Sequence, residues 1–253
     1  MYYWTDAEDQ FFMLDGDRIS SLAASFISEL VESAGLKDLL RIGVVQTAYA
    51  NGGSTNYITR HLKLPVICTP TGVKHLHHVA QQFDIGVYFE ANGHGTVLFS
   101  IDAIKAFKQS PPQSPAQKDA MEILAALGDM VNQTVGDALS DMLLVEVILA
   151  HKGWTLRDWG MTYSDLPNRL VRVEVGDKDL FRTTDAERRL SHPEGAQEEI
   201  DMAVKKYSEA RAFARASGTE NACRVYAEAA THTEANELAD RVARIIERYG
   251  GSQ

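Results

Sequence analysis

Three strand-sized apolar segments, at residues 42–47, 65–68 and 85–89, constrain the fold more than any other feature of the sequence. The first two are each followed by a glycine-containing polar loop and then by a helical pattern, which begins near Ser54 or Val73. Strands that alternate with helices need crossover connections, which are typical of a largely parallel sheet. We therefore predict a mixed, largely parallel α/β domain, with further helices at 17–35, 116–132 and 136–151.

The pattern changes beyond about residue 166, where short strands appear in place of the regular alternation of strands and helices. Strands are expected at 170–175 and 222–229, and helices at 194–207 and 233–248. Residues 211–226 read as a strand, a polar loop and a second strand. This part is interpreted as a separate, smaller α+β domain.

The third apolar segment ends abruptly in a polar loop, where Glu90, Asn92 and His94 follow in quick succession. Gly93 and Gly95 allow other groups to approach the backbone there. In open α/β sheets, ligands bind just outside the carboxyl ends of the strands. A carboxylate accepts hydrogen bonds and an amide both donates and accepts them, a pair that suits sugar hydroxyls. The loop is therefore predicted to bind a sugar.

A second polar loop, at 215–220, is rich in groups that bind anions. Arg215, Ser217, Gly218 and Thr219 supply a guanidinium, two hydroxyls and backbone N–H groups, and Arg224 lies nearby. Such a nest suits a phosphate group. An ordinary polar turn with surface arginines fits the same spacing, so both interpretations stay open on the residues alone.

The charge of the chain limits the classes of partner. A net charge of −10 argues against nucleic acid as a partner, since that needs a basic face. No apolar stretch approaches the roughly 20 residues of a membrane span, and the N-terminus has no secretory pattern. Cys68 and Cys223 lie far apart, which is typical of free thiols in a reducing compartment, although one disulfide stays possible. We expect a cytoplasmic protein without a nucleic-acid or membrane partner; the oligomeric state stays open.

Six ordered segments closely resemble the phosphoacetylglucosamine mutases, a family of the α-D-phosphohexomutase superfamily. Two of them are the polar loops above, Glu-Ala-Asn-Gly-His-Gly-Thr and Arg-Ala-Ser-Gly-Thr-Glu. The six lie at 43–52, 71–78, 90–96, 136–143, 183–188 and 215–220. The resemblance extends along essentially the whole chain.

The resemblance implies an isomerase of four domains that interconverts N-acetylglucosamine 6-phosphate and 1-phosphate for UDP-N-acetylglucosamine synthesis. In this family a phosphoserine donates its phosphoryl group, Mg²⁺ assists, and a bisphosphate intermediate reorients. The resemblance places Glu90, Ala91 and Asn92 in the sugar-binding loop of the third domain. It places the phosphate site of the fourth domain at Arg215, Ala216, Ser217, Gly218, Thr219 and Arg224. Lys74, His75 and His94 are less direct matches.

Two motifs of the family are absent from this sequence. Neither the phosphoserine loop, Thr-Ala-Ser-His-Asn-Pro, nor the metal loop, Asp-Gly-Asp-x-Asp-Arg, occurs in it. The chain therefore resembles the C-terminal half of the enzyme: 1–16 as a remnant of the second domain, 17–163 as the third and 164–253 as the fourth. No catalytic residue and no metal ligand are predicted here, and the Mg²⁺ ligands are expected in the full-length enzyme. The isolated chain is predicted to be inactive; the alternative is a non-catalytic sugar-phosphate-binding fragment.

Some acidic and apolar residues have simpler roles than chemistry. Asp15 and Asp17 offer two carboxylates where the metal loop has three, and Asp17 is expected to cap a helix instead. Asp137 and Asp141 could form an acid/base pair, but the helix dipole explains Asp137 adequately. The apolar stripe at 142–145 is predicted to be core.

The remaining candidates concern histidines and one departure from the family. His75 and His78 could share a helix face and bind a metal, but Lys74 would repel a cation, so a helix start is preferred. Ala216 stands where the family usually has proline. Alanine leaves the phosphate loop less constrained by about 0.4–1 kcal/mol, which predicts weaker preorganisation and not lost binding.

Overall fold

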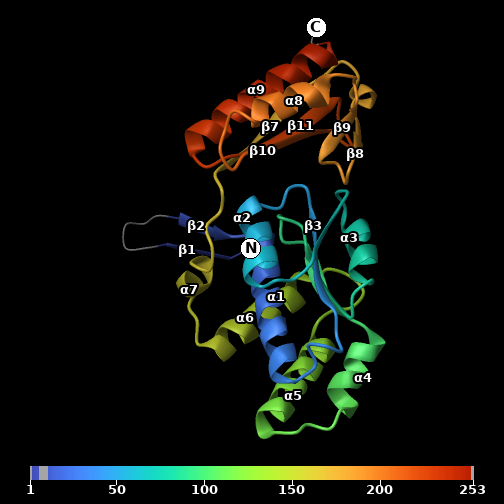
Figure 1. Ribbon diagram of the computed structural model, residues 1–253, viewed down its shortest axis with the longest axis vertical. Coiled ribbons are helices and arrows are strands. Elements are labelled where there is room, and N and C mark those ends of the chain that lie inside the picture. Colours follow the sequence, from blue (N-terminus) through green and yellow to red (C-terminus); the bar gives the residue numbers. More distant parts are fainter. Residues whose placement is uncertain (1, 6–10, 252–253) are drawn as a thin grey trace. The chain divides into compact units, whose positions relative to one another are not determined.

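The computed structural model describes residues 2–5, for the backbone alone, and residues 11–251 (Figure 1). The chain divides into two compact units, Met1–Ser164 and Asp165–Gln253. Each unit has its own hydrophobic core. The interpretation of residues 1–16 as a domain remnant falls in part on residues 1 and 6–10, outside the described residues.

The first unit is built on a four-stranded sheet of mixed direction, with the strand order β4-β3-β5-β6. Strand β3 (Ile42–Thr47) pairs in parallel with β4 (Val66–Thr69) and β5 (Ile85–Phe89). Strand β6 (Gly95–Phe99) returns antiparallel to β5 as a hairpin. The predicted mixed, largely parallel α/β class is confirmed, and all residues of β3 and β5 are buried, as a strand covered on both faces requires.

Helices cover both faces of this sheet. One face carries α1 (Gly16–Ser33), α5 (Pro115–Met130) and α6 (Ala138–Lys152), which share the larger core with alternate residues of β5. The opposite face carries α3 (Val73–Ala80), whose Leu76 packs with Val45 and Tyr88 in a smaller core. The unit also contains β1 (Tyr2–Thr5), β2 (Phe11–Leu14), α2 (Gly52–Asn56), the π-helical turn η1 (Tyr57–His61), α4 (Ile101–Gln109) and α7 (Leu156–Gly160).

Helix α1 begins differently from the prediction. Its N-cap is Asp15, whose carboxylate accepts a hydrogen bond from the Arg18 N–H at 3.1 Å. Asp17, expected as the cap, lies inside the first turn, and its carboxylate accepts from the Asn51 N–H at 2.7 Å. The expectation was wrong by two residues because Asp17 has a tertiary partner that the sequence does not reveal.

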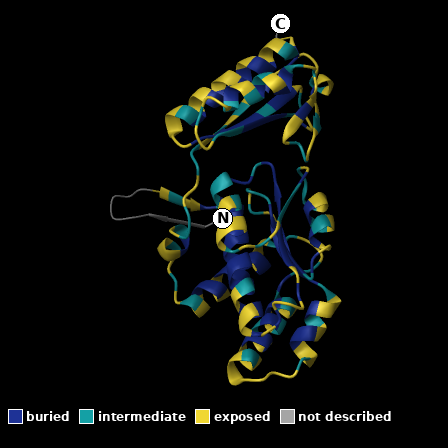
Figure 2. Ribbon diagram, in the orientation of Figure 1, coloured by how far each residue is buried: buried dark blue, intermediate teal, exposed yellow. Residues whose placement is uncertain are grey.

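Helix α6 corrects a second expectation. Of the stripe at 142–145, Leu144 and Val145 are buried, but Met142 and Leu143 are exposed. Figure 2 shows the burial along the chain. Only two of the four residues therefore belong to the core, and the other two face outward. Asp137 is the N-cap of α6 and accepts from the Leu139 N–H at 3.0 Å, in keeping with the role expected for it.

The second unit is a three-stranded antiparallel sheet with two helices on one face. Its order is β10 (Arg211–Ala216), β11 (Ala222–Glu228) and β7 (Asn168–Glu174). Helices α8 (Ala196–Val204) and α9 (His232–Gly250) share a core with alternate residues of these strands. A hairpin of β8 (Arg182–Thr184) and β9 (Arg189–His192), and the 3₁₀ turn η2 (Lys178–Leu180), complete the unit. Within the described residues, no helix is both long and apolar enough to span a membrane.

Candidate functional site

The loop between β5 and β6 is held by its own polar groups and by the start of α3. The Glu90 carboxylate accepts from the Gly72 N–H at 3.0 Å and, with its other oxygen, from the Asn92 amide at 3.3 Å. The Asn92 carbonyl oxygen in turn accepts from the His94 N–H at 2.8 Å. Asn92 and His94 are exposed and Glu90 is partly exposed. The structure therefore brings the three predicted side chains into one short hydrogen-bonded loop with solvent access.

Glycines make this loop possible in two ways. Gly93 has a φ of 90°, which a residue with a side chain rarely adopts, and its N–H donates to the Glu90 carbonyl at 2.8 Å. Gly16, at the start of α1, donates its N–H to the Ala91 carbonyl at 3.1 Å. A Cβ atom on Gly16 would lie 1.8 Å from the Glu90 carbonyl oxygen. Helix α1 thus fixes the loop by a backbone contact that only glycine permits.

Lys74 and His75 are exposed in the first turn of α3, which begins directly after Gly72, the glycine whose N–H donates to Glu90. The histidine two residues on, His77, instead places its Nδ1 3.0 Å from the Tyr88 hydroxyl, on the side of α3 that faces the sheet. Within the described residues, no group of three His, Cys, Asp or Glu side chains could hold a metal ion. Lys74 and His75 thus lie in the helix turn that follows Gly72, whereas the side chain of His77 is held against Tyr88 of the sheet.

In the second unit, strand register places three arginines side by side. Arg215 on β10 pairs with Arg224 on β11, and Arg224 pairs with Arg172 on β7. Residues directly opposite on neighbouring strands project from the same face. The alternate residues Ala214, Cys223 and Val173 enter the core with α8 and α9, so the arginines project from the other face of the sheet. We call Arg215, Arg224 and Arg172 the arginine row. Arg172 was not predicted as a site residue. The one indication in the sequence is that a charged residue alternates with apolar residues in this strand.

The loop beside the arginine row is turned by its own groups. The buried Ser217 donates its N–H to the Ala222 carbonyl at 2.7 Å, and Lys178 donates to the Gly218 carbonyl at 3.1 Å. The Thr219 N–H lies 3.5 Å from the Ser217 hydroxyl oxygen, at the limit of a hydrogen bond. The loop thus carries one buried and one exposed hydroxyl residue next to the arginines.

Carboxylates lie beside all three guanidinium groups of the arginine row. Glu220 accepts from Arg172 at 2.7 Å and from Arg224 at 2.9 Å. The hydrogen bond and charge of Arg172, more than the charge of Arg224, hold the pKa of Glu220 below its ordinary value. Glu187 lies 3.7 Å from the Arg215 guanidinium, an ion-pair distance too long for a hydrogen bond.

Glu187 ends an unusual turn between β8 and β9. Asp185, Ala186 and Glu187 have φ values of 52°, 54° and 67°, all left-handed, although none is glycine. Each such residue costs roughly 1–2 kcal/mol. The turn belongs to the segment 183–188, to which sequence analysis gave no role.

The backbone around Ala216 would also accept a proline, the residue expected there from the resemblance. Because the Ser217 N–H bonds to Ala222, the pair Ala216 and Cys223 is the intervening, non-hydrogen-bonded pair. Strand β10 is the edge of its sheet, so the Ala216 N–H has no partner strand on its outer side. Proline is tolerated at such a position.

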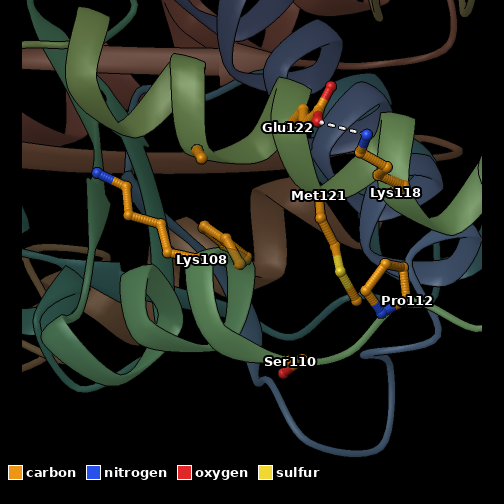
Figure 3. Close-up of a pocket in the computed structure, with 8 residues that line it drawn as sticks. Lys108, Ser110, Pro112, Lys118, Met121 and Glu122 are labelled. Atoms are coloured by element: carbon orange, nitrogen blue, oxygen red, sulfur yellow. Dashed lines mark ion pairs between the residues drawn. The ribbon is translucent and has the colours of Figure 1, made fainter.

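A pocket of about 290 Å³ lies between α4 and α5, apart from every predicted site residue (Figure 3). Phe107, Pro112 and Met121 contribute to its lining, and Lys118 pairs with Glu122 at 3.6 Å at its side. Its second lysine, Lys108, pairs with Asp129 at 3.1 Å, so both lysines of the lining already have a carboxylate partner. The pocket does not alter the assignment of the two loops.

Two different family models match the two units of the chain. A family model described as phosphoacetylglucosamine mutase AMG1, domain III, matches residues 15–154, more than half of the chain. The chain belongs to the phosphoacetylglucosamine mutase family. A model described as the C-terminal domain of phosphoglucomutase/phosphomannomutase matches residues 170–245. The resemblance inferred from the sequence is therefore confirmed.

Named relatives agree with this membership. The human phosphoacetylglucosamine mutase is 52% identical over 252 residues, 99% of this chain and 46% of its own length. An Aspergillus fumigatus N-acetylphosphoglucosamine mutase, solved with GlcNAc-6P and magnesium, is 60% identical with a TM-score of 0.97, over 98% of this chain and 46% of that one. This chain thus spans about half the length of the relatives, and the predicted restriction to the C-terminal half of the family is confirmed.

Proposed function

We propose that the chain provides the sugar- and phosphate-binding part of a phosphoacetylglucosamine mutase, which interconverts N-acetylglucosamine 6-phosphate and 1-phosphate. The arginine row beside the 217–219 loop is the observation that carries the proposal. Three guanidiniums and two hydroxyls at one strand end suit a phosphate, which accepts several charge-assisted hydrogen bonds. GlcNAc-6P, with which the Aspergillus enzyme was solved, carries such a phosphate.

The proposal assigns roles to the two loops. Glu90 and Asn92, with the backbone of Ala91, contact sugar hydroxyls, and Lys74, His75 and His94 border that loop. The phosphate is held by the arginine row and by the loop of Ala216, Ser217, Gly218 and Thr219. We assign residues 17–163 to the third domain of the family, 164–253 to the fourth and 1–16 to the end of the second.

The chemical step requires groups that this sequence does not supply. Phosphoryl transfer needs a nucleophile that carries the phosphoryl group and a cation that offsets the charge of the transition state. The phosphoserine and metal loops of the family are absent from the sequence. We propose that Mg²⁺, named in the Aspergillus structure, is bound by the part of the relatives outside the matched half. The chain alone should then show no turnover in a coupled mutase assay; measurable turnover would contradict this.

Calorimetric titration of the chain with N-acetylglucosamine 6-phosphate tests the phosphate assignment. Losing a charge-assisted hydrogen bond costs about 1.5–3 kcal/mol, so Arg172→Ala should weaken binding roughly 10–100-fold. Arg169→Ala is the matched control: it lies on the same strand but pairs with Asp240 at 3.0 Å and not with the row. The control should bind within twofold of the parent chain. Equal affinities for both variants would refute the role of the arginine row.

A further inference from the structure

Helix α6 presents apolar side chains on both of its sides. Leu144, Val145, Ile148 and Leu149 are buried in the core of the first unit. Leu139, Met142, Leu143 and Val147 are exposed by 70%, 45%, 49% and 38%. These four positions follow the spacing of one helix face, i, i+3, i+4 and i+8. We call them the outer face of α6.

The two longest helices of the chain, α1 and α9, have polar residues at their exposed positions. The exposed positions of α1 within the described residues are polar, at Glu29, Glu32 and Ser33. In α9 the exposed positions are His232, Thr233, Asn236, Glu237, Asp240, Arg241, Arg244, Glu247 and Arg248. Apolar residues on the outer side of a helix, in addition to its core side, are typical of a helix that is covered by another surface. The outer face of α6 thus has the composition of an interface.

A membrane is a poor partner for this face. The helix has 15 residues, fewer than the roughly 20 that span a bilayer. Its outer side also carries the exposed Glu146 between Leu143 and Val147. A surface helix that binds lipid usually has a basic polar face. A protein surface is the better match.

The length of the relatives indicates which protein surface this is. More than half of each matched relative lies outside the aligned part, since this chain covers 46% of the human protein. The first unit matches a domain numbered III, and the chain's own second unit matches the C-terminal domain. The remainder of the relatives therefore precedes the matched half. We propose that the outer face of α6 is the surface on which this preceding half of a full-length mutase docks, through an apolar patch of its own.

Thiol labelling tests the proposal without disrupting the fold. On a Cys68→Ser background, only the fully buried Cys223 remains. Leu143→Cys then reports on the outer face, and Ile101→Cys on α4, exposed by 75%, is the matched control. Both introduced thiols should react rapidly with a maleimide in the isolated chain. With the preceding half of the human relative fused ahead of Met1, the thiol of the Leu143→Cys variant should react at least tenfold more slowly. The thiol of the Ile101→Cys variant should stay within twofold of its former rate.

The labelling rates distinguish the preceding half from other surfaces that could cover the outer face of α6. Equal rates for the Leu143→Cys variant in the chain and in the fusion would overturn the proposal. Slow labelling in the isolated chain would also overturn it: dependence on protein concentration would indicate a second copy, and independence would indicate the chain's own second unit. Leu139→Cys on the same face should repeat the result. The residue aligned with Leu143 in the natural full-length human protein, changed to cysteine, provides the same measurement if the fusion fails to fold. The outcome does not depend on the proposed substrate.

Discussion

Asp141 carries a buried carboxyl group whose ionisation should weaken the first unit. Its Oδ1 is buried and has no hydrogen-bond partner. Burial, and secondly the charge of Asp137, raise the pKa of Asp141 from 3.8 to about 7. The folded protein therefore binds more protons than the unfolded chain between about pH 4 and pH 7, so this group lowers stability as the pH rises through that range.

The size of the effect follows from the shift. About three pKa units correspond to roughly 4 kcal/mol at 1.36 kcal/mol per unit. Asp141 lies in the first turn of α6, where the helix dipole favours a negative charge by about 0.3–1 kcal/mol. We therefore expect Asp141→Asn, which keeps the shape and removes the charge, to stabilise the first unit by about 1–3 kcal/mol at pH 8. At pH 5 the gain should fall by more than half, because the carboxyl is then protonated in the folded protein; it should vanish only below about pH 4, where the unfolded chain is protonated as well.

Tryptophan fluorescence isolates the relevant unit, since Trp4, Trp154 and Trp159 all belong to the first one. Urea unfolding at pH 5, 6, 7 and 8 gives the free energy of unfolding of parent and variant. Asp102→Asn, an exposed acid in the first turn of α4, is the control and should show no such pH-dependent gain. A difference between Asp141→Asn and the parent that is the same at pH 5 and pH 8 would refute the reasoning.

Three further substitutions test the two loops. Gly16→Ala places a Cβ 1.8 Å from the Glu90 carbonyl oxygen and should cost the first unit about 1–3 kcal/mol by tryptophan-detected unfolding; an unchanged midpoint would contradict the close contact. Ala216→Pro should stabilise the second unit by about 0.4–1 kcal/mol in calorimetry, and a loss would show that the Ala216 N–H is needed. Ala186→Gly, at a φ of 54°, should stabilise that unit by up to about 1 kcal/mol, since the relief of strain exceeds the entropy that glycine adds to the unfolded chain; a lower melting temperature would contradict this.

The sequence predicted local features well and features set by distant pairing poorly. Strand β3 occupies the predicted residues 42–47, and the polar loop follows β5 as expected, because an apolar run and its polar end are both local signals. Arg172 escaped notice because its place beside Arg224 is set by strand register across about 50 residues of chain. Helix α4 and the β8–β9 hairpin were not predicted either.

Tertiary contacts explain why two predictions, the N-cap of α1 and the burial of α6, were wrong. Asp15 and Asp17 both satisfy the preference for a helix cap, and the choice between them depends on a hydrogen bond from Asn51, far along the chain. The apolar residues of α6 were correctly identified as a helix. Their sequence pattern does not reveal which of them are exposed. Only packing shows that Leu143 faces outward while Leu144 enters the core.

The arginine row shows how far chemistry can be inferred from residue types. Two of its arginines suggested a cationic nest, yet each arginine of the row lies beside a carboxylate: Arg215 beside Glu187, and Arg224 and Arg172 beside Glu220. A phosphate would therefore exchange with carboxylates already in place, and would not simply meet open charge. A phosphate monoester carries about −1.5 to −2 charges at neutral pH and three acceptor oxygens, against one charge and two oxygens for a carboxylate. The exchange is thus favourable in charge but opposed by each lost ion pair, so the affinity depends on the acidic neighbours as much as on the arginines themselves.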